Sequence, residues 1–260
     1  MSTYPSEGHD PYYREYARAY DEHSRGVPGD VEFYVALARE AGAVVELGVG
    51  TGRIAVPTAQ AGVPVLGFDR EPAMLEVARE KAEVAGVSHL VTLRDGDMRS
   101  FTLDAPVPLV TIPFRTFLHN LTTEDQIATL RACRDALGPG GRLALNVFNP
   151  DLRMMAKWMG RRAEDWEPFG WEGYQAHQDY RPTEQVVTTS LRVRDEDGQW
   201  RRTSFRLRYV HRYEMQHLLE RCRFEVESLW GGFQGQPYQD GAPEMVWIAK
   251  RSERDVETLV

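Results

Sequence analysis

The sequence predicts an α/β fold, and three consecutive stretches support that prediction. Residues 43–47 form an apolar run with β-branched side chains, which is typical of a buried strand. Residues 48–52 then make a glycine-rich turn, where a ligand can lie directly against the backbone. Residues 53–62 have the spacing of a short helix. A strand, a glycine turn and a helix in this order form the first half of a nucleotide-type site.

Composition limits the classes of protein to which the chain can belong. Its 260 residues are enough for one domain with an insertion, and 42% apolar residues indicate a globular protein. The formal net charge of -8 argues against nucleic acid as the main partner, because phosphate binding needs a basic surface. The N-terminus has no apolar core for export, and no run is long enough to span a membrane. With Cys133 and Cys222 at apolar helical positions, we expect a cytoplasmic protein without membrane contacts.

The glycine turn indicates which kind of nucleotide is bound. Gly48, Gly50 and Gly52 alternate with other residues, and Arg53 stands where a dinucleotide fingerprint needs its third glycine. Glu46 precedes the turn, where its charge would repel a pyrophosphate but favour a ligand that carries an ammonium group. This pattern resembles motif I of the class I S-adenosylmethionine-dependent methyltransferases.

The resemblance implies S-adenosylmethionine as cofactor, S-adenosylhomocysteine as product, and a Rossmann-like sheet. That sheet is mostly parallel, with an antiparallel last strand, and here it would carry an inserted helix and β-hairpin. We accordingly expect N-terminal lid helices in 1–40, the cofactor-binding core in 41–148 and 211–251, a substrate-cap or dimerisation insertion in 149–210, and a tail in 252–260.

A second apolar run, residues 63–68, ends in Asp69, about 20 residues beyond the glycine turn. A carboxylate at this place can accept hydrogen bonds from both ribose hydroxyls, although Asp69 could instead be an ordinary helix cap. Pro72 favours a helix start, with Met74 on its buried face. We assign Asp69, Arg70 and Met74 to the cofactor.

A third strand, at residues 90–93, is followed by Asp97 and Met98. The Asp-Met step resembles the adenine-binding loop of the same family. There the acidic side chain accepts from the adenine amino group, and the next backbone amide contacts the ring. The alternative is a plain polar turn.

The fourth strand, residues 107–114, must direct its carboxyl end toward the ligand crevice. Enzymes that methylate the exocyclic amines of bases share an Asn- or Asp-Pro-Pro-Tyr stretch here, whereas this chain has Ile-Pro-Phe-Arg. It therefore resembles the small-molecule branch. We assign Ile112 to the cofactor, and Phe114, Phe117 and His119 to the methyl acceptor. His119 is a candidate general base, or else a partly buried residue at a helix start.

Tyr12, Tyr16 and Tyr20 share one face of a predicted N-terminal helix, and a second helix starts at Asp30. These tyrosines could pack on the sheet or form a lid over the cofactor. The Tyr20-Asp21 pair resembles the segment that closes the cofactor site in small-molecule N-methyltransferases. We assign Tyr20 to the cofactor and Tyr12 to the substrate.

The remaining chain continues the alternation after one interruption. The predicted elements are a helix starting at Thr122, a strand at 142–148, a helical piece at 154–166, a hairpin of 186–194 and 199–210, a helix at 213–222, and strands at 224–230 and 244–251. The hairpin has one apolar and one basic face. We expect its apolar face to cover the mouth of the site or to form a homodimer contact.

The sequence therefore predicts methyl transfer from S-adenosylmethionine to an amine or hydroxyl of a small molecule. The seven histidines lack paired ligand spacing, so no metal is expected. A nicotinamide-dependent reductase is the alternative, and Arg53 and the terminal strand pair argue against it. A catalytically silent protein that binds S-adenosylmethionine is the third possibility.

Overall fold

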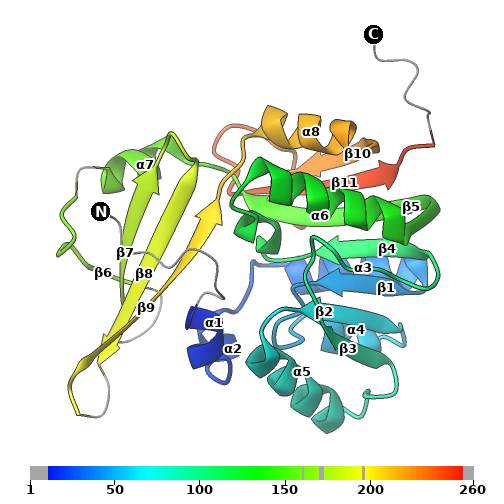
Figure 1. Cartoon of the computed structure of the whole chain (residues 1–260), viewed down its shortest axis with the longest axis horizontal. Coiled ribbons are helices and arrows are strands. Elements are labelled where there is room, and N and C mark those ends of the chain that lie inside the picture. Colours follow the sequence, from blue (N-terminus) through cyan, green and yellow to red (C-terminus); the bar gives the residue numbers. More distant parts are fainter. Residues whose placement is uncertain (1–10, 160, 170–172, 195–196, 254–260) are drawn as a thin grey trace.

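The computed structural model describes residues 11–159, 161–169, 173–194 and 197–253. Two sheets organise this part of the chain, one with seven strands and one with four. In Figure 1 the seven-stranded sheet lies on the right and the four-stranded sheet on the left, with the short helices α1 and α2 between them. The predicted α/β core and the inserted hairpin are both present.

The seven-stranded sheet has the order β10-β11-β5-β4-β1-β2-β3. Its strands are β1 (Val44–Leu47), β2 (Val65–Asp69), β3 (Val91–Asp95), β4 (Val107–Ile112), β5 (Leu137–Phe148), β10 (Phe224–Trp230) and β11 (Glu244–Arg251). The first five strands pair in parallel, whereas β11 pairs antiparallel with both β5 and β10. The antiparallel ending is thus confirmed. The strand order reverses between β1 and β4, which is where open α/β sheets bind ligands.

Helices cover both faces of this sheet. They are α3 (Asp30–Ala41), α4 (Ala55–Gln60), α5 (Pro72–Val84), α6 (Thr123–Ala136) and α8 (Arg212–Arg221). Successive strand residues point to opposite faces, so Val45 packs in the core beneath α6 and α8 and Val44 packs in the core beneath α3. Thr122 caps α6 as expected, because its hydroxyl accepts from the Asp125 amide at 3.1 Å.

The N-terminal tyrosines do not share a single helix. Helix α1 (Pro11–Tyr16) ends at Tyr16, and α2 (Tyr20–His23) starts four residues later, so the predicted continuous helix is wrong. The rings still gather, with Tyr12 and Tyr16 stacked at 5.6 Å and Tyr12 and Tyr20 edge to face at 6.2 Å.

The insertion differs from the prediction in two ways. Its helix is α7 (Leu152–Trp158), shorter than the predicted 154–166. Asp151 caps it by accepting from the Arg153 amide at 2.7 Å, and the backbone becomes extended at Met159. The hairpin also belongs to a larger sheet with the order β6-β7-β8-β9. Its strands are β6 (Glu167–Pro168), β7 (Gln175–Arg181), β8 (Val186–Arg194) and β9 (Trp200–Arg208).

The apolar face of the four-stranded sheet packs against the N-terminal tyrosines. Tyr12, Ala176 and Leu191 form a buried cluster, and Phe205 packs at its edge. The N-terminal tyrosines thus cover much of the apolar face from which a dimer contact was expected. The homodimer stays a prediction. No helix in the described ranges is both long enough and apolar enough to cross a membrane.

Candidate active site

A cavity lies at the carboxyl ends of β1, β2 and β4, where the strand order reverses. Its lining comes from both halves of the core and from the N-terminal helices. The lining residues are Tyr13, Tyr20, Gly48, Gly50, Asp69, Arg70, Glu71, Met74, Gly96, Met98, Phe114, Thr116 and His119. Nine of these were assigned to the site from the sequence: Tyr20, Gly48, Gly50, Asp69, Arg70, Met74, Met98, Phe114 and His119.

The glycine turn after β1 has a backbone that other residues adopt only with strain. Gly48 has φ 68° and Gly50 has φ 54°. A Cβ on Gly48 would lie 2.2 Å from Cγ2 of Thr116, whereas the nearest atom to a Cβ on Gly50 is 3.8 Å away. Gly48 thus permits close packing of the loop after β4, and Gly50 leaves room for a ligand to approach the backbone. Gly52 does not line the cavity but packs against Val56 and Ala78 of the helices behind it.

Asp69 connects the two walls of the cavity. One carboxylate oxygen accepts from the Gly50 amide at 2.8 Å, and the other accepts from the Glu71 amide at 2.9 Å. Burial raises the pKa of Asp69, while these backbone donors and the nearby His119 lower it. A carboxylate has about four acceptor positions. Asp69 therefore anchors the glycine turn and retains acceptor capacity toward the cavity.

Glu46 lies in β1, directly below the turn, and its side chain is buried. The pKa of Glu46 is raised to about 8, mainly by burial; Arg53 opposes this shift, and the neighbouring Asp69 and Asp30 add to it. Arg53 itself is bound in two places by Asp30, at 2.7 and 2.9 Å. Glu46 is not among the lining residues, so its predicted contact with an ammonium group stays a prediction.

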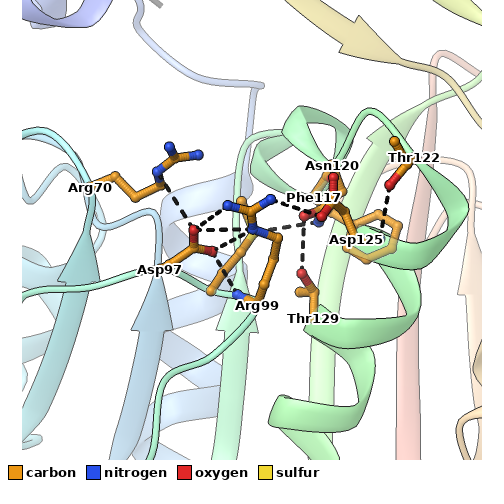
Figure 2. Close-up of polar contacts among 9 residues, drawn as sticks. Arg70, Asp97, Arg99, Phe117, Asn120, Thr122, Asp125 and Thr129 are labelled. Carbon is orange, nitrogen blue, oxygen red and sulfur yellow. Dashed lines mark hydrogen bonds and ion pairs between the residues drawn. The ribbon is translucent and has the colours of Figure 1, made fainter. Parts of the chain in front are cut away.

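Asp97 is held by a neighbour that was not expected (Figure 2). The guanidinium of Arg99 donates to both of its oxygens, at 2.6 to 3.1 Å, and bonds Asp125 of α6 at 2.8 Å. Burial works to raise the pKa of Asp97, but the bonds from Arg99 outweigh it and the net shift is downward. Asp97 faces a second hollow beside the cavity, which also includes Arg70 and Gly96. Its bond to adenine stays a prediction.

Asn120 links the loop after β3, which carries Met98, to the short 3₁₀ helix η1 (Thr116–His119). Its amide nitrogen donates to the Phe117 carbonyl at 3.0 Å and approaches the Met98 sulfur at 3.6 Å. Its carbonyl accepts from the Thr129 hydroxyl at 3.1 Å (Figure 2). This buried network fixes the turn that carries His119.

The loop after β4 brings only part of the predicted acceptor wall to the cavity. Phe114 has φ 52° and lines it, but Phe117 is fully buried in the core. Phe117 lies within the 3₁₀ helix η1, which directs its ring inward, so its assignment to the acceptor is not supported. Ile112 is likewise fully buried and does not line the cavity.

On the N-terminal side, Tyr13 lines the cavity and Tyr12 does not. Tyr12 belongs instead to the buried cluster on the second sheet. Its neighbour Tyr13 therefore occupies the place in the cavity wall that was assigned to Tyr12. The Tyr13 hydroxyl lies 2.8 Å from Nε2 of His119. This bond joins α1 to η1 across the cavity. The sequence analysis also missed Glu71, Gly96 and Thr116, each of which lies within two residues of a predicted position.

Helix α2 closes over the glycine turn. Tyr20 lines the cavity, and burial raises the pKa of its hydroxyl. Asp21 accepts from the Thr51 hydroxyl and from the Lys81 ammonium group, both at 2.5 Å. The segment therefore bonds to both the turn and α5. Among the described residues, no His, Cys, Asp and Glu side chains gather in a group of three that could hold a metal ion.

Comparisons with known sequences agree with this geometry. Residues 44–141 match the family model described as a methyltransferase domain. A ubiquinone biosynthesis O-methyltransferase of Dinoroseobacter shibae is 30% identical over 139 residues, or 48% of this chain and 53% of that protein. A cypemycin N-terminal methyltransferase of Streptomyces sp is 32% identical over 107 residues, or 41% of this chain and 42% of that protein. The chain spans about half the length of the curated relatives that it matches.

Solved structures are similar over nearly the whole chain. The CcbJ methyltransferase from Streptomyces caelestis has a TM-score of 0.83 at 25% identity, covering 95% of this chain and 100% of that one. CalS10, an amino pentose methyltransferase from Micromonospora echinaspora solved with S-adenosylmethionine bound, has a TM-score of 0.61 at 22% identity, covering 96% and 100%. The matching domain, the antiparallel end of the sheet and the cavity at its switch point all agree: residues 44–141 form a methyltransferase domain, and the sheet around it has the fold of the class I S-adenosylmethionine-dependent methyltransferases.

Proposed function

We propose that this chain transfers a methyl group from S-adenosylmethionine to an amine or hydroxyl of a small molecule. The observation that carries the proposal is one cavity that joins the glycine turn, the Asp69 carboxylate and the Tyr13–His119 pair. When bound, the cofactor supplies an electrophilic methyl group on a sulfonium. The chain's own residues then need to align an acceptor and exclude water.

The residues present fit this cofactor. Gly50 leaves its backbone open to a ligand, and Asp69 can accept from a pair of ribose hydroxyls. Met98 offers an apolar surface for a ring, with Asp97 beside it in the neighbouring hollow. The Asp69 carboxylate, which accepts two backbone N–H bonds, gives this end of the sheet a negative charge that favours a ligand with cationic groups.

His119 and Tyr13 are the groups that could move a proton on the acceptor side. The Tyr13 hydroxyl is bonded to Nε2 of His119, so a proton released by an acceptor can pass to the imidazole directly or through the phenol. Phe114 supplies an apolar wall beside them. This arrangement favours an acceptor that must lose a proton, either a hydroxyl or an ammonium group. The curated relatives include both O- and N-terminal methyltransferases.

The N-terminal helices and the insertion fit the roles of a lid and a substrate cap. Tyr13 and Tyr20 line the cavity, and Asp21 ties their segment to the glycine turn. Phe205 of the second sheet lies 6.4 Å from the Tyr13 ring. The second sheet therefore supports the lid from outside. Sedimentation at tens of micromolar protein would test whether the same sheet also forms a homodimer.

The proton-transfer assignment is tested by replacing the imidazole. His119→Ala should lower turnover by roughly 10²-fold or more and leave cofactor affinity nearly unchanged. His119→Asn tests whether hydrogen bonding alone suffices, and His89→Ala, at an exposed histidine, is the matched control. Turnover is measured as S-adenosylhomocysteine formed with a panel of small amines and hydroxyl compounds. Normal turnover of the His119→Ala variant would make His119 structural and leave positioning as the whole of catalysis.

A further inference from the structure

The four-stranded sheet carries a second, chemically distinct surface on the face opposite Tyr12. Arg192 pairs with Arg202 across β8 and β9, and Arg194 pairs with Trp200. These paired side chains lie on one face, because alternate residues along a strand do. Trp166, from the segment before β6, completes the group. We call Trp166, Arg192, Arg194, Trp200 and Arg202 the Arg–Trp face.

The guanidinium groups of this face lie on indole rings. The Arg192 Cζ is 4.3 Å from the Trp166 ring centroid and 4.4 Å from that of Trp200. Arg194 lies 4.6 Å from Trp200, and Arg202 lies 5.6 Å from Trp166. Stacking of this kind holds a guanidinium by its flat side and leaves its N–H edge free to bind an anion.

The positive charge of these three arginines meets no acidic partner within the described part of the chain. Over the described ranges, no ion pair joins Arg192, Arg194 or Arg202 to an acid. The nearby Glu167 is bonded instead to Lys157 and Arg161, at 2.6 and 2.7 Å.

The hydrogen bonds that these arginines donate go to neutral acceptors. Arg192 donates to the Gln175 side chain at 2.8 Å, and Arg194 donates to the Gly198 carbonyl at 2.7 Å. Burial, and then repulsion from Arg202 and Arg194, lowers the pKa of Arg192. A concentrated positive patch, with Arg194 and Arg202 exposed, therefore lies on a chain with a net charge of -8, and the described residues place no acidic partner on it.

We propose that the Arg–Trp face docks a partner protein through a segment of clustered carboxylates. Tryptophan and arginine are enriched among the residues that dominate protein–protein binding energy, and a guanidinium edge matches a carboxylate in two bonds. Nucleic acid fits less well, because a long polyanion needs a broad basic surface and this patch is small on an acidic chain. The proposal is independent of methyl transfer, since the active-site cavity has no residue in common with this face.

Fluorescence anisotropy on the full chain tests the proposal. The probes are a labelled glutamate-rich peptide of about twelve residues, its glutamine-for-glutamate counterpart, and a single-stranded DNA of similar length. We expect the chain to bind the acidic peptide and not the neutral one. The variant Arg192→Gln/Arg194→Gln/Arg202→Gln should bind the acidic peptide at least roughly tenfold more weakly. The control Arg79→Gln/Arg131→Gln/Arg221→Gln removes the same charge at exposed sites elsewhere and should bind like the parent.

A third variant separates stacked arginines from charge alone. Arg192→Lys/Arg194→Lys/Arg202→Lys keeps every charge but loses the planar fork, so its affinity for the acidic peptide should also fall. Equal binding by this variant and the parent would overturn the proposal, as would equal losses in the Gln variant and its control. Absence of binding to the acidic peptide at millimolar concentration would do the same. Preferential binding of the DNA, lost in the Gln variant, would assign the face to nucleic acid instead. Circular dichroism confirms that each variant is folded.

Discussion

Asn146 should be among the residues on which the stability of this chain depends most. It is fully buried in β5, and its carbonyl accepts from the Phe114 amide at 2.7 Å and from the Tyr34 hydroxyl at 2.9 Å. Its amide nitrogen donates to Glu244 at 3.0 Å, and Glu244 is in turn paired with Arg115. Phe114 and Arg115 both have positive φ, so this network holds the strained start of the loop that lines the cavity.

The substitution Asn146→Leu keeps the size of the side chain and removes all three bonds. Each buried polar group left without a partner costs about 1 to 3 kcal/mol, so the loss of three bonds should lower the free energy of unfolding by roughly 3 to 9 kcal/mol. Since domains of this kind have about 5 to 15 kcal/mol in total, the variant should lose a large part of its stability.

Urea unfolding followed by circular dichroism measures this loss. Tyr34→Phe removes one hydroxyl and should cost only about 1 kcal/mol. Asn149→Leu removes the bonds of a half-buried asparagine to Tyr238 and to the Ala242 carbonyl, and it should also cost much less than Asn146→Leu. If Asn146→Leu unfolds within about 1 kcal/mol of the parent, the network does not stabilise the fold and the reasoning is refuted.

Three further changes test other parts of the account. Because the pKa of Glu46 is raised from 4.5 to about 8, the folded chain holds a proton that the unfolded chain releases, so the free energy of unfolding should fall as pH rises between these values. Glu46→Gln should remove that slope, and an unchanged slope would assign it to other groups. Asp21→Ala breaks the bonds to Thr51 and Lys81, so S-adenosylhomocysteine should dissociate faster in stopped-flow measurements; an unchanged rate would mean that α2 does not close the site. Gly48→Ala places a Cβ at a residue with positive φ, where it clashes with Thr116, so the melting temperature should fall by several degrees. An unchanged melting temperature would contradict this turn geometry.

The core could be predicted because its signals are local. The strands at 224–230 and 244–251 have the predicted bounds, since apolar residues that alternate with polar ones favour a half-buried strand and an apolar run favours a buried one. Asp69 was found from its spacing, because it ends the second apolar run about 20 residues beyond the glycine turn. The strand β7 was missed because it is polar on both faces apart from Ala176.

The acceptor side was predicted less well, because it depends on which way a side chain points. Tyr12 and Tyr13 are adjacent, and only the packing of α1 on the second sheet determines that Tyr13 enters the cavity. Phe114 likewise precedes a 3₁₀ helix that contains Phe117 and turns it into the core, and the sequence does not reveal this helix. The bond from Arg99 to Asp97 likewise depends on which way a side chain points.

Calorimetric titration with S-adenosylmethionine, S-adenosylhomocysteine and NAD tests the central claim most directly, with the parent chain and with Asp69→Ala. We expect the parent chain to bind the first two ligands and not NAD. Loss of the Asp69 carboxylate should remove charge-assisted bonds and weaken binding by on the order of 2 to 4 kcal/mol, with the fold intact by circular dichroism. Binding of NAD in place of S-adenosylmethionine, or unchanged affinity in a folded Asp69→Ala variant, would contradict it.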